Sequence, residues 1–269
     1  MLYRSRSWLI WCRNIGDAVE RFGSDLRFSL NFIGVLFYSL WAAIRHPRFV
    51  KWQTVAYYVD TCGAGALPII SLLGLLIGVI LAFQGLVQLS RYGGNSYVVN
   101  LVGAVIVTEL APLMTAVVLA GRSGSAFAAE IGTMQTGEEV DALITMGLEP
   151  ERFLLTPKVL ALLVVLPSLD LVASVCGIIG GMLVICARVE ISMTEYFYKV
   201  IDVVQVIDLC QGLIKSVVFG LIIASVGCMR GFAAPRDAQG VGRAATAAIV
   251  TAIFLIIVAD AIITAIFSL

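Results

Sequence analysis

The chain contains five long stretches of almost uninterrupted apolar residues, and this feature limits the folds open to it more than any other. A helix that crosses a bilayer needs about 20 mostly apolar residues. Only 13% of the 269 residues are charged and 60% are hydrophobic, whereas an average soluble domain is about 25% charged. The sequence therefore predicts an all-α, polytopic membrane protein. The predicted spans are about 67–89, 97–119, 159–187, 209–229 and 245–267.

The segment before the first span is apolar but carries polar interruptions. Residues 26–44 have the length of a span, yet they include Arg27 and Asn31, and Trp41 is a residue type that prefers the membrane interface. We interpret 7–44 as an amphipathic helix that lies along the membrane, with a sixth span as the competing interpretation. The chain then divides into an N-terminal cytoplasmic or interfacial helical region, 1–52, and a transmembrane domain, 53–269.

Lysine and arginine are distributed unequally between the two sides of these spans. The N-terminal region carries eight, and the connections after the second and fourth spans carry three each, which places 14 on one side. The opposite side has three, Arg91, Arg188 and Lys199. Because basic loops remain in the cytoplasm, we expect the N-terminus inside and the C-terminus outside.

Composition and motifs exclude several classes of function. A net charge of zero excludes a strongly basic nucleic-acid binder. The six cysteines show no CxxC or zinc-ligand spacing and His46 is the only histidine, so we expect neither a metal site nor a catalytic residue. The run 121–124 matches the GxSG motif of intramembrane proteases, but that chemistry needs a base, normally histidine, and no span contains one. No Walker A sequence occurs, so ATP-driven transport would require another subunit.

The connection between the second and third spans is the most informative stretch. It begins with small residues that allow close helix approach, and then acidic residues lead into an apolar run that closes at Gly147, a residue suited to a helix C-terminus. Pro150 and Pro157 lie where the chain returns to the membrane. We interpret about 136–148 as a short amphipathic cytoplasmic helix, which is either a solvated loop helix or a docking site for a cytoplasmic partner. The candidate docking residues are Glu138, Glu139, Asp141, Ala142, Met146 and Gly147.

Four ionisable residues interrupt the spans: Glu109, Asp170, Lys215 and Asp260. Each costs roughly 2.5–3.5 kcal/mol near the bilayer centre, so each should face protein or a wet cavity. We favour an intramembrane charge network in which Lys215 pairs with Asp170 or Asp260. Glu109 precedes Pro112, which opens the helix backbone, and this carboxylate either lines a cavity as a proton or substrate site or forms a buried pair.

Glycines at four-residue spacing occur in two spans. Gly74 and Gly78 form GxxxG in the first span, and Gly177 and Gly181 form it in the third. Such pairs let two helix backbones approach closely because no side chain stands between them. We therefore expect a close-packed helix face at each pair.

The run from Glu109 to Ala161, ELAPLMTAVVLAGRSGSAFAAEIGTMQTGEEVDALITMGLEPERFLLTPKVLA, resembles the signature region of MlaE/YrbE-type permeases. Further matches are Phe83-Gln84-Gly85 and the segments 213–220 and 240–246. The resemblance extends over about 67–269.

This resemblance implies the membrane subunit of an ABC transporter that moves phospholipids or related lipids, located in the bacterial inner membrane with a periplasmic C-terminus. Two copies pair, each with an interfacial helix and five spans. A cytoplasmic ATPase binds ATP and magnesium, so this chain itself carries no cofactor. The other implied partners are a small STAS-domain protein and a periplasmic ring of MCE-domain proteins.

The resemblance also implies where the lipid and the ATPase bind. The coupling helix of the family corresponds to 138–147, and the lipid cavity lies at the dimer interface, open outward. One departure is Thr108, where some relatives carry an arginine that would contact the lipid phosphate. The positions that match the family's lipid-binding residues are Leu81, Leu89, Tyr92, Glu109, Leu110 and Leu113.

Two other classes of function remain open from the residues alone. An ion-coupled secondary transporter would use the intramembrane carboxylates Glu109, Asp170 and Asp260 together with Lys215, and it would work without an ATPase. A membrane scaffold would transport nothing.

Overall fold

The computed structural model describes residues 32, 34–36, 38–39, 41–42, 45, 50–89, 97–189 and 191–267. The segment 7–44, predicted to be an interfacial helix, lies largely outside these residues. The chain divides by its internal contacts into two units, 1–49 and 50–269. The account below concerns the second unit.

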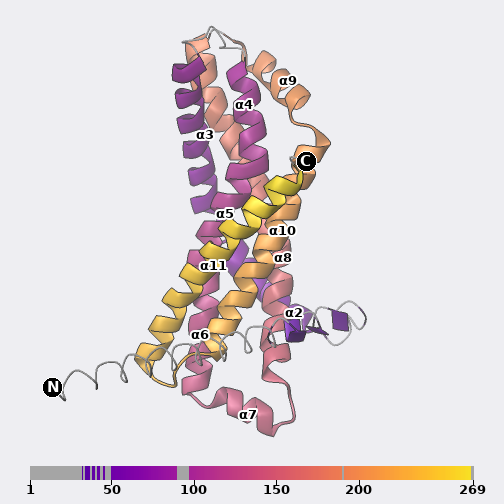
Figure 1. Ribbon diagram of the computed structural model, residues 1–269, viewed down its shortest axis with the longest axis vertical. Helices are drawn as coiled ribbons and strands as arrows, with labels where there is room; N and C mark the ends of the chain where they lie inside the picture. Colours follow the sequence, from indigo (N-terminus) through magenta and orange to yellow (C-terminus); the bar gives the residue numbers. More distant parts are fainter. Residues whose placement is uncertain are drawn as a thin grey trace, which may run out of the picture. The chain divides into compact units, whose positions relative to one another are not determined.

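Five helices of this unit are long and apolar enough to cross a membrane (Figure 1). This confirms the predicted all-helical, five-span architecture, and all regular structure among the described residues is helical. The second membrane helix runs continuously from Tyr97 to Thr136 through several segments. The other four are α3 (Leu67–Leu89), α8 (Pro150–Val189), α10 (Val206–Phe232) and α11 (Ala238–Phe267).

Four of the five membrane helices extend beyond the predicted apolar runs, and α3 has the predicted bounds. Helix α8 has 40 residues and begins at Pro150, so Pro157, which precedes the predicted span, lies inside the helix. A proline removes one backbone hydrogen bond, but neighbouring helices tolerate this in membrane proteins. Pro157 is itself buried, which fits a helix packed on its neighbours at this point.

The second membrane helix contains two wider turns. Its α segments are α4 (Tyr97–Val105), α5 (Ala111–Leu119) and α6 (Ser125–Thr136), and π-helical segments η3 (Ile106–Leu110) and η4 (Ala120–Gly124) separate them. In η3 the Ala111 N–H donates to the carbonyl of Ile106, five residues earlier. Pro112 follows directly, and a proline cannot donate the next bond of a regular helix. The wider turn therefore adapts the helix to Pro112.

Glycines bring four of the membrane helices into backbone contact, in two pairs. A Cβ atom on Gly74 would lie 2.7 Å from the Ala173 carbonyl, and one on Gly78 would overlap the Gly177 carbonyl. The predicted GxxxG faces of α3 and α8 thus pack on each other. On α10, a Cβ on Gly227 would lie 2.7 Å from the Gly124 carbonyl in η4. Close approach of this kind requires glycine.

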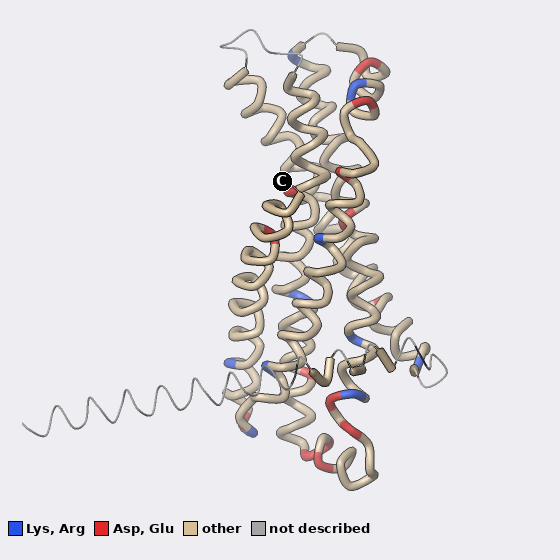
Figure 2. The backbone as a smooth tube through the Cα atoms, turned by 45° about the vertical axis from the view of Figure 1, so that its right-hand side comes forward, with Lys and Arg blue, Asp and Glu red and all other residues tan. Residues whose placement is uncertain are grey.

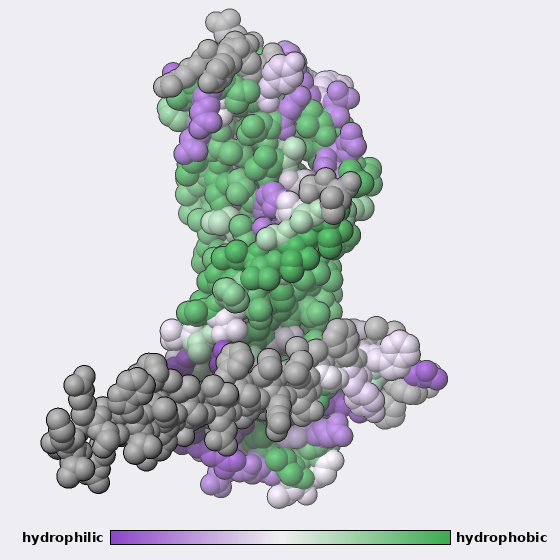
Figure 3. Space-filling model, in the orientation of Figure 1, coloured by the Kyte–Doolittle hydropathy of each residue, from purple (hydrophilic) through white to green (hydrophobic). Residues whose placement is uncertain are grey.

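Three shorter helices lie at the two ends of the bundle (Figure 1). At one end, here called the α7 end, are α2 (Trp52–Gly63) and α7 (Glu139–Thr145), together with the α6 segment of the second membrane helix. At the other, the α9 end, is α9 (Met193–Val203). Charged residues gather at the two ends (Figure 2), and on the face that Figure 3 shows the surface between them is mainly a hydrophobic band. A band of this kind is the surface that a bilayer covers.

Candidate functional site

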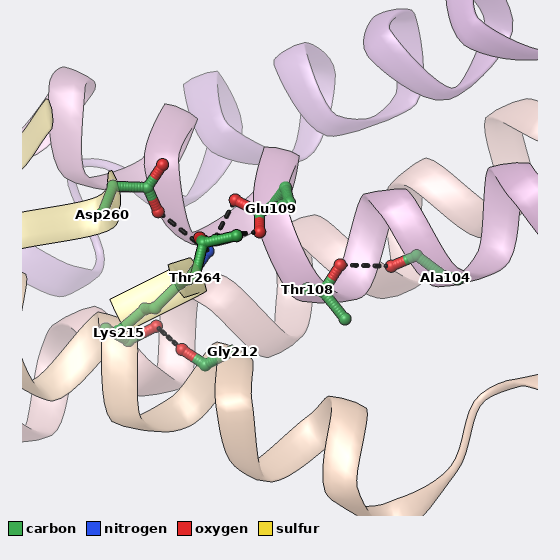
Figure 4. A network of polar contacts seen from close by, with 8 residues as sticks. Ala104, Thr108, Glu109, Gly212, Lys215, Asp260 and Thr264 are labelled. Atoms are coloured by element: carbon green, nitrogen blue, oxygen red, sulfur yellow. Dashed lines mark hydrogen bonds and ion pairs between the residues drawn. The ribbon is translucent and has the colours of Figure 1, made fainter. Parts of the chain in front are cut away.

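A compact set of polar side chains lies within the hydrophobic band, and we call Glu109, Lys215, Asp260 and Thr264 the intramembrane cluster (Figure 4). The Lys215 ammonium donates to Glu109 Oε2 at 2.5 Å and to Thr264 Oγ1 at 2.8 Å. It also forms an ion pair with Asp260 Oδ1 at 2.8 Å. Thr264 in turn donates to the second oxygen of Glu109, at 3.0 Å. The cluster therefore joins η3, α10 and α11.

Burial makes this cluster strongly interdependent. The Lys215 side chain is fully buried, whereas those of Glu109 and Asp260 are 29% and 18% exposed. An ammonium has three donors, and three oxygens surround this one. With both carboxyls ionised, the cluster carries a formal charge of −1 beside the hydrocarbon. Ionisable residues inside a membrane are costly, and those that occur are usually functional or tightly paired.

The sequence allows Lys215 to pair with Asp170 or with Asp260, and the structure shows which pair forms. Lys215 pairs with Asp260, and Glu109 is its second carboxylate. Asp170 is buried and instead lies 2.5 Å from the hydroxyl of Ser216. Among the described residues no ion pair joins Asp170 to Lys215, so Asp170 stands apart from the intramembrane cluster. Lys215 and Ser216 are adjacent in α10, but Lys215 contacts the carboxyls of Glu109 and Asp260, whereas Ser216 contacts that of Asp170.

The π-helical segment η3 positions Glu109 for this role. Thr108, the residue before it, turns its hydroxyl back to the Ala104 carbonyl at 2.9 Å (Figure 4). Thr108 therefore contacts its own helix, while Glu109 reaches toward α10 and α11. π-helical turns occur frequently at functional sites, and this one carries the carboxylate whose role the sequence leaves undecided.

A narrow apolar hollow, with about 10 Å³ of free space, lies beside η3, between α3, α5 and α8. Leu110, the neighbour of Glu109, lines it. The hydroxyl of Thr115 also lines it and is buried without a hydrogen-bond partner. The remaining lining residues are Ile70, Leu73, Gly74, Ile77, Ile106, Ala111, Met114, Val118 and Ala173.

Of the six predicted lipid-contacting residues, the structure brings one to this hollow. Leu110 lines it and Glu109 belongs to the adjacent cluster. Leu81 and Leu89 lie on α3 and Leu113 on α5, all half-buried, but none of the three lines the hollow. Tyr92 lies outside the described residues. Hydrophobicity predicts such residues poorly, because leucines facing lipid, protein or cavity look alike in a sequence.

At the α7 end, the predicted amphipathic helix is present as α7. Glu138 adopts a left-handed conformation, with φ of 58°, before its first residue, and Gly147, with φ of 74°, follows its last turn. Val140 is its one buried residue. Three apolar side chains at its end are exposed: Ile144 (57%), Met146 (65%) and Leu148 (40%). Of these, the sequence interpretation named Met146 alone.

Asp141 of α7 forms an ion pair with Arg236, which lies just before the last membrane helix, α11. Arg236 donates to both Asp141 oxygens, at 2.8 and 3.1 Å. The paired geometry is the strong form of an arginine–carboxylate contact. It connects α7 to the segment that immediately precedes α11, about 95 positions away in the sequence.

A second polar group at the α7 end joins α2, α6 and α8, and no residue pattern in the sequence predicts it. The Tyr58 hydroxyl donates to Glu130 at 2.6 Å, and the buried Lys158 ammonium lies 2.9 Å from the same carboxylate. Burial, followed by the bond to Glu130, raises the pKa of Tyr58 well above its ordinary value. The hydroxyl therefore remains a donor and fixes α2 to the bundle.

Comparison with known proteins gives consistent results. The sequence model of a family described as Permease MlaE matches residues 55–266. A probable ABC transporter permease protein of Rickettsia prowazekii is 35% identical over 76% of this chain and 79% of its own length. One from Synechocystis is 36% identical over 68% of this chain and 70% of its own length. The Arabidopsis thaliana protein TRIGALACTOSYLDIACYLGLYCEROL 1, chloroplastic, is 32% identical over 81% of this chain and 62% of its own length.

Proposed function

Because the chain belongs to the MlaE permease family, we propose that it is the membrane subunit of an ABC transporter that moves phospholipids or related lipids. In this proposal it lies in a bacterial inner membrane with the α7 end in the cytoplasm, and lipid passes between that membrane and periplasmic MCE-domain proteins. A separate ATPase binds ATP and magnesium and drives the transport. The chain itself catalyses no reaction.

The observation that carries this proposal is the exposed apolar end of α7. Ile144, Met146 and Leu148 lie in the connection between two membrane helices, outside the hydrophobic band, and are 40% to 65% exposed. Exposed apolar residues grouped in this way mark interaction sites. The acidic residues Glu138 and Glu139 and the neighbouring Gly147 border this surface, which suits a groove on a cytoplasmic ATPase.

Lipid as the cargo is supported by the apolar lining of the hollow beside η3. The hollow in one copy has only about 10 Å³ of free space, whereas pockets of about 300–1,000 Å³ hold drug-sized ligands, so one copy alone does not enclose a diacyl lipid. We therefore propose that two copies enclose the lipid together, with Leu81, Leu89, Leu110 and Leu113 toward its chains. Glu109 and Tyr92 would lie toward the headgroup. The name of the Arabidopsis relative contains that of a galactolipid.

The contacts provide a route by which ATPase closure would reach the lipid. Force on α7 passes through the Asp141–Arg236 pair to the start of α11. Helix α11 carries Asp260 and Thr264, which hold Lys215 and Glu109. Glu109 belongs to η3, whose neighbour Leu110 lines the hollow. The proposed change is therefore a shift between two packings of α11 against η3, as in other helix-shift mechanisms.

The test is copurification from membranes, read by native mass spectrometry of the full-length tagged chain. Replacing Ile144 and Met146 by serine removes apolar area from the docking surface, and we expect most of the ATPase to be lost from the complex. The matched control is Ile201→Ser on α9, which is equally exposed (71%) but lies at the other end. Retention of the full ATPase complement by the α7 variant, or copurification of the wild-type chain without any ATPase or lipid, would contradict the proposal.

An ion-coupled secondary transporter remains the second candidate, favoured by the two carboxyl groups that meet Lys215 in the intramembrane cluster. It predicts substrate movement in liposomes that contain this chain alone and a proton or sodium gradient. The ABC proposal predicts movement only when the ATPase and ATP are present.

A further inference from the structure

Asp170 of α8 is a carboxyl group that neither the intramembrane cluster nor the α7 docking surface uses. It is only 3% exposed and lies within a membrane helix. Its Oδ2 atom is 2.5 Å from the Ser216 hydroxyl of α10, and its Oδ1 atom has no hydrogen-bond partner among the described residues. A buried carboxylate without a cation is very unfavourable. The charge state of Asp170 therefore follows from the groups around it.

The hydrogen bonds of Ser216 indicate where a proton lies. Its Oγ atom is 2.9 Å from the Gly212 carbonyl and 2.5 Å from Asp170 Oδ2. A serine hydroxyl has one hydrogen, so it can donate to only one of these two oxygens. If Asp170 carries a proton on Oδ2, that proton is donated to Ser216 Oγ, and the Ser216 hydroxyl donates to Gly212. Both contacts are then complete hydrogen bonds.

The packing around this contact is tight enough to exclude other arrangements of α10. A Cβ atom on Gly212 would lie 2.6 Å from the Val107 carbonyl of η3 and 3.7 Å from Asp170 Oδ2. The carboxyl is thus enclosed between α8 and a turn of α10 that itself lies against η3. A neutral carboxylic acid fits such a site, because it loses far less by leaving water than a carboxylate does.

Among the described residues, Asp170 forms no ion pair with a cation. On α10 the nearest charged residue along the chain is Lys215, whose ammonium already contacts Glu109 of η3 and Asp260 of α11. On α8 itself Lys158 is 12 residues away, about 18 Å along the helix. Helices α3 and α5, which also pack on α8, contain no titratable side chain. An ionised Asp170 would add a third carboxylate to a region with one ammonium.

We propose that Asp170 is a proton-binding site that is occupied in the folded protein. The neutral carboxylic acid donates from Oδ2 to Ser216 and joins α8 to α10 without adding charge to the membrane. It thereby leaves the Lys215 ammonium to Glu109 and Asp260. Helix α10 is then held to α8 by a neutral hydrogen bond and to η3 and α11 by ion pairs. The inference concerns the chain alone and depends on neither a lipid nor an ATPase.

The experiment is infrared spectroscopy of the full-length chain in nanodiscs at neutral pH. A protonated carboxyl gives a C=O band that a carboxylate lacks. In water at neutral pH, aspartate is ionised in about a thousandfold excess, so aspartates on the surface contribute no such band. We expect a protonated C=O band that shifts when the side chains of all aspartates are isotopically labelled, and that is lost in Asp170→Asn. The control Asp202→Asn changes an exposed aspartate of α9 and should leave the band in place.

A second pair of variants tests the hydrogen bond itself. Ser216→Ala removes the acceptor of the Asp170 proton, so the band should remain and move to a higher frequency. Ser225→Ala is the matched control, because Ser225 also lies on α10 and donates to the carbonyl four residues earlier, that of Leu221. Its hydroxyl contacts no carboxyl among the described residues, so the band should not move.

Three results would overturn the proposal. They are the absence of a protonated aspartate band from the labelled wild-type chain, a band that survives Asp170→Asn, and a band that Ser216→Ala leaves unmoved. The first needs no variant. The third decides the assignment even if Asp170→Asn does not fold, because Asp170 is the carboxyl that contacts Ser216. None of these measurements involves the ATPase, so their failure leaves the α7 docking test unaffected.

Discussion

At the scale of single residues, Lys215 provides the positive charge that the carboxyls of the intramembrane cluster share. It is fully buried between two carboxylates and a hydroxyl from η3 and α11. A buried ammonium without partners is very unfavourable, and so are two carboxylates left without their cation. The energy of the cluster therefore belongs to the group as a whole and cannot be divided among its members.

The first prediction concerns this interdependence. Lys215→Met leaves Glu109 and Asp260 facing each other without a cation, and breaking such a buried pair costs about 3–5 kcal/mol. We expect a large fall in the thermal unfolding temperature of the detergent-purified protein. Adding Glu109→Gln and Asp260→Asn to Lys215→Met removes the uncompensated charge, so the triple variant should be more stable than the single one.

Lys199→Met is the matched control, because Lys199 pairs with Glu195 on the surface of α9 and is 33% exposed. Its unfolding temperature should remain near that of the wild type. A triple variant no more stable than Lys215→Met would show that the cluster is not held together by charge.

Part of this site could be predicted from the sequence. Burying ionisable residues in lipid is so costly that Glu109, Lys215 and Asp260 had to find partners, and their residue types limited the pairing to a few choices. The final choice depends on how the helices rotate about their axes, which apolar segments specify weakly. The π-helical turn at η3 rotates Glu109 toward Lys215, and no residue pattern predicts that turn beyond Pro112 itself.

At the scale of elements, the helix contacts were easier to predict than the helix ends. The GxxxG pairs of α3 and α8 meet as expected, because only glycine allows that approach. Helix ends were less predictable, since hydrophobicity marks the hydrocarbon and gives no sign of a helix that continues into water. The second membrane helix therefore runs to Thr136, well past the predicted end at 119.

The second prediction tests the α3–α8 contact. Gly78→Val places a branched side chain where a Cβ alone would already overlap the Gly177 carbonyl. Overpacking typically costs about 1–3 kcal/mol, and here the obstacle is backbone, which cannot rotate away. We expect a lower unfolding temperature and poor recovery of monodisperse protein.

Gly121→Ala provides the comparison, because a Cβ there would meet nothing within 4 Å. That variant should be as stable as the wild type. Equal stability of Gly78→Val and Gly121→Ala would show that the helices can separate at no cost.

At the scale of the whole molecule, the Asp141–Arg236 pair is the contact that connects the docking helix to the membrane part. Its side chains are 44% and 55% exposed, so it contributes little to stability. Its proposed importance is mechanical, because it joins α7 to the start of α11.

The third prediction is a charge exchange across this pair. Asp141→Arg and Arg236→Asp each place like charges together, and we expect each to lower lipid-stimulated ATP hydrolysis by the reconstituted complex. The double variant restores an opposite pair and should recover most of that stimulation. The ATPase should copurify with all three, because the apolar end of α7 is unchanged.

Recovery is the decisive result for this prediction. If the double variant is as defective as the single ones, α7 and α11 are not coupled through this contact. If the single variants are fully active, the route through α11 is incorrect.

The two wide turns of the second membrane helix also have a geometric consequence. Helix α5 lies between η3 and η4, and each wide turn holds one residue more than a regular α-helical turn needs. If η3 tightened while η4 accepted a further residue, α5 would advance by about 1.5 Å and rotate by about 100°. Its neighbours α4 and α6 would stay in place. Such a shift would exchange hydrogen bonds to the fifth residue before for bonds to the fourth in η3, and the reverse in η4, so the rotation of α5 is set by how these two turns share their extra residues.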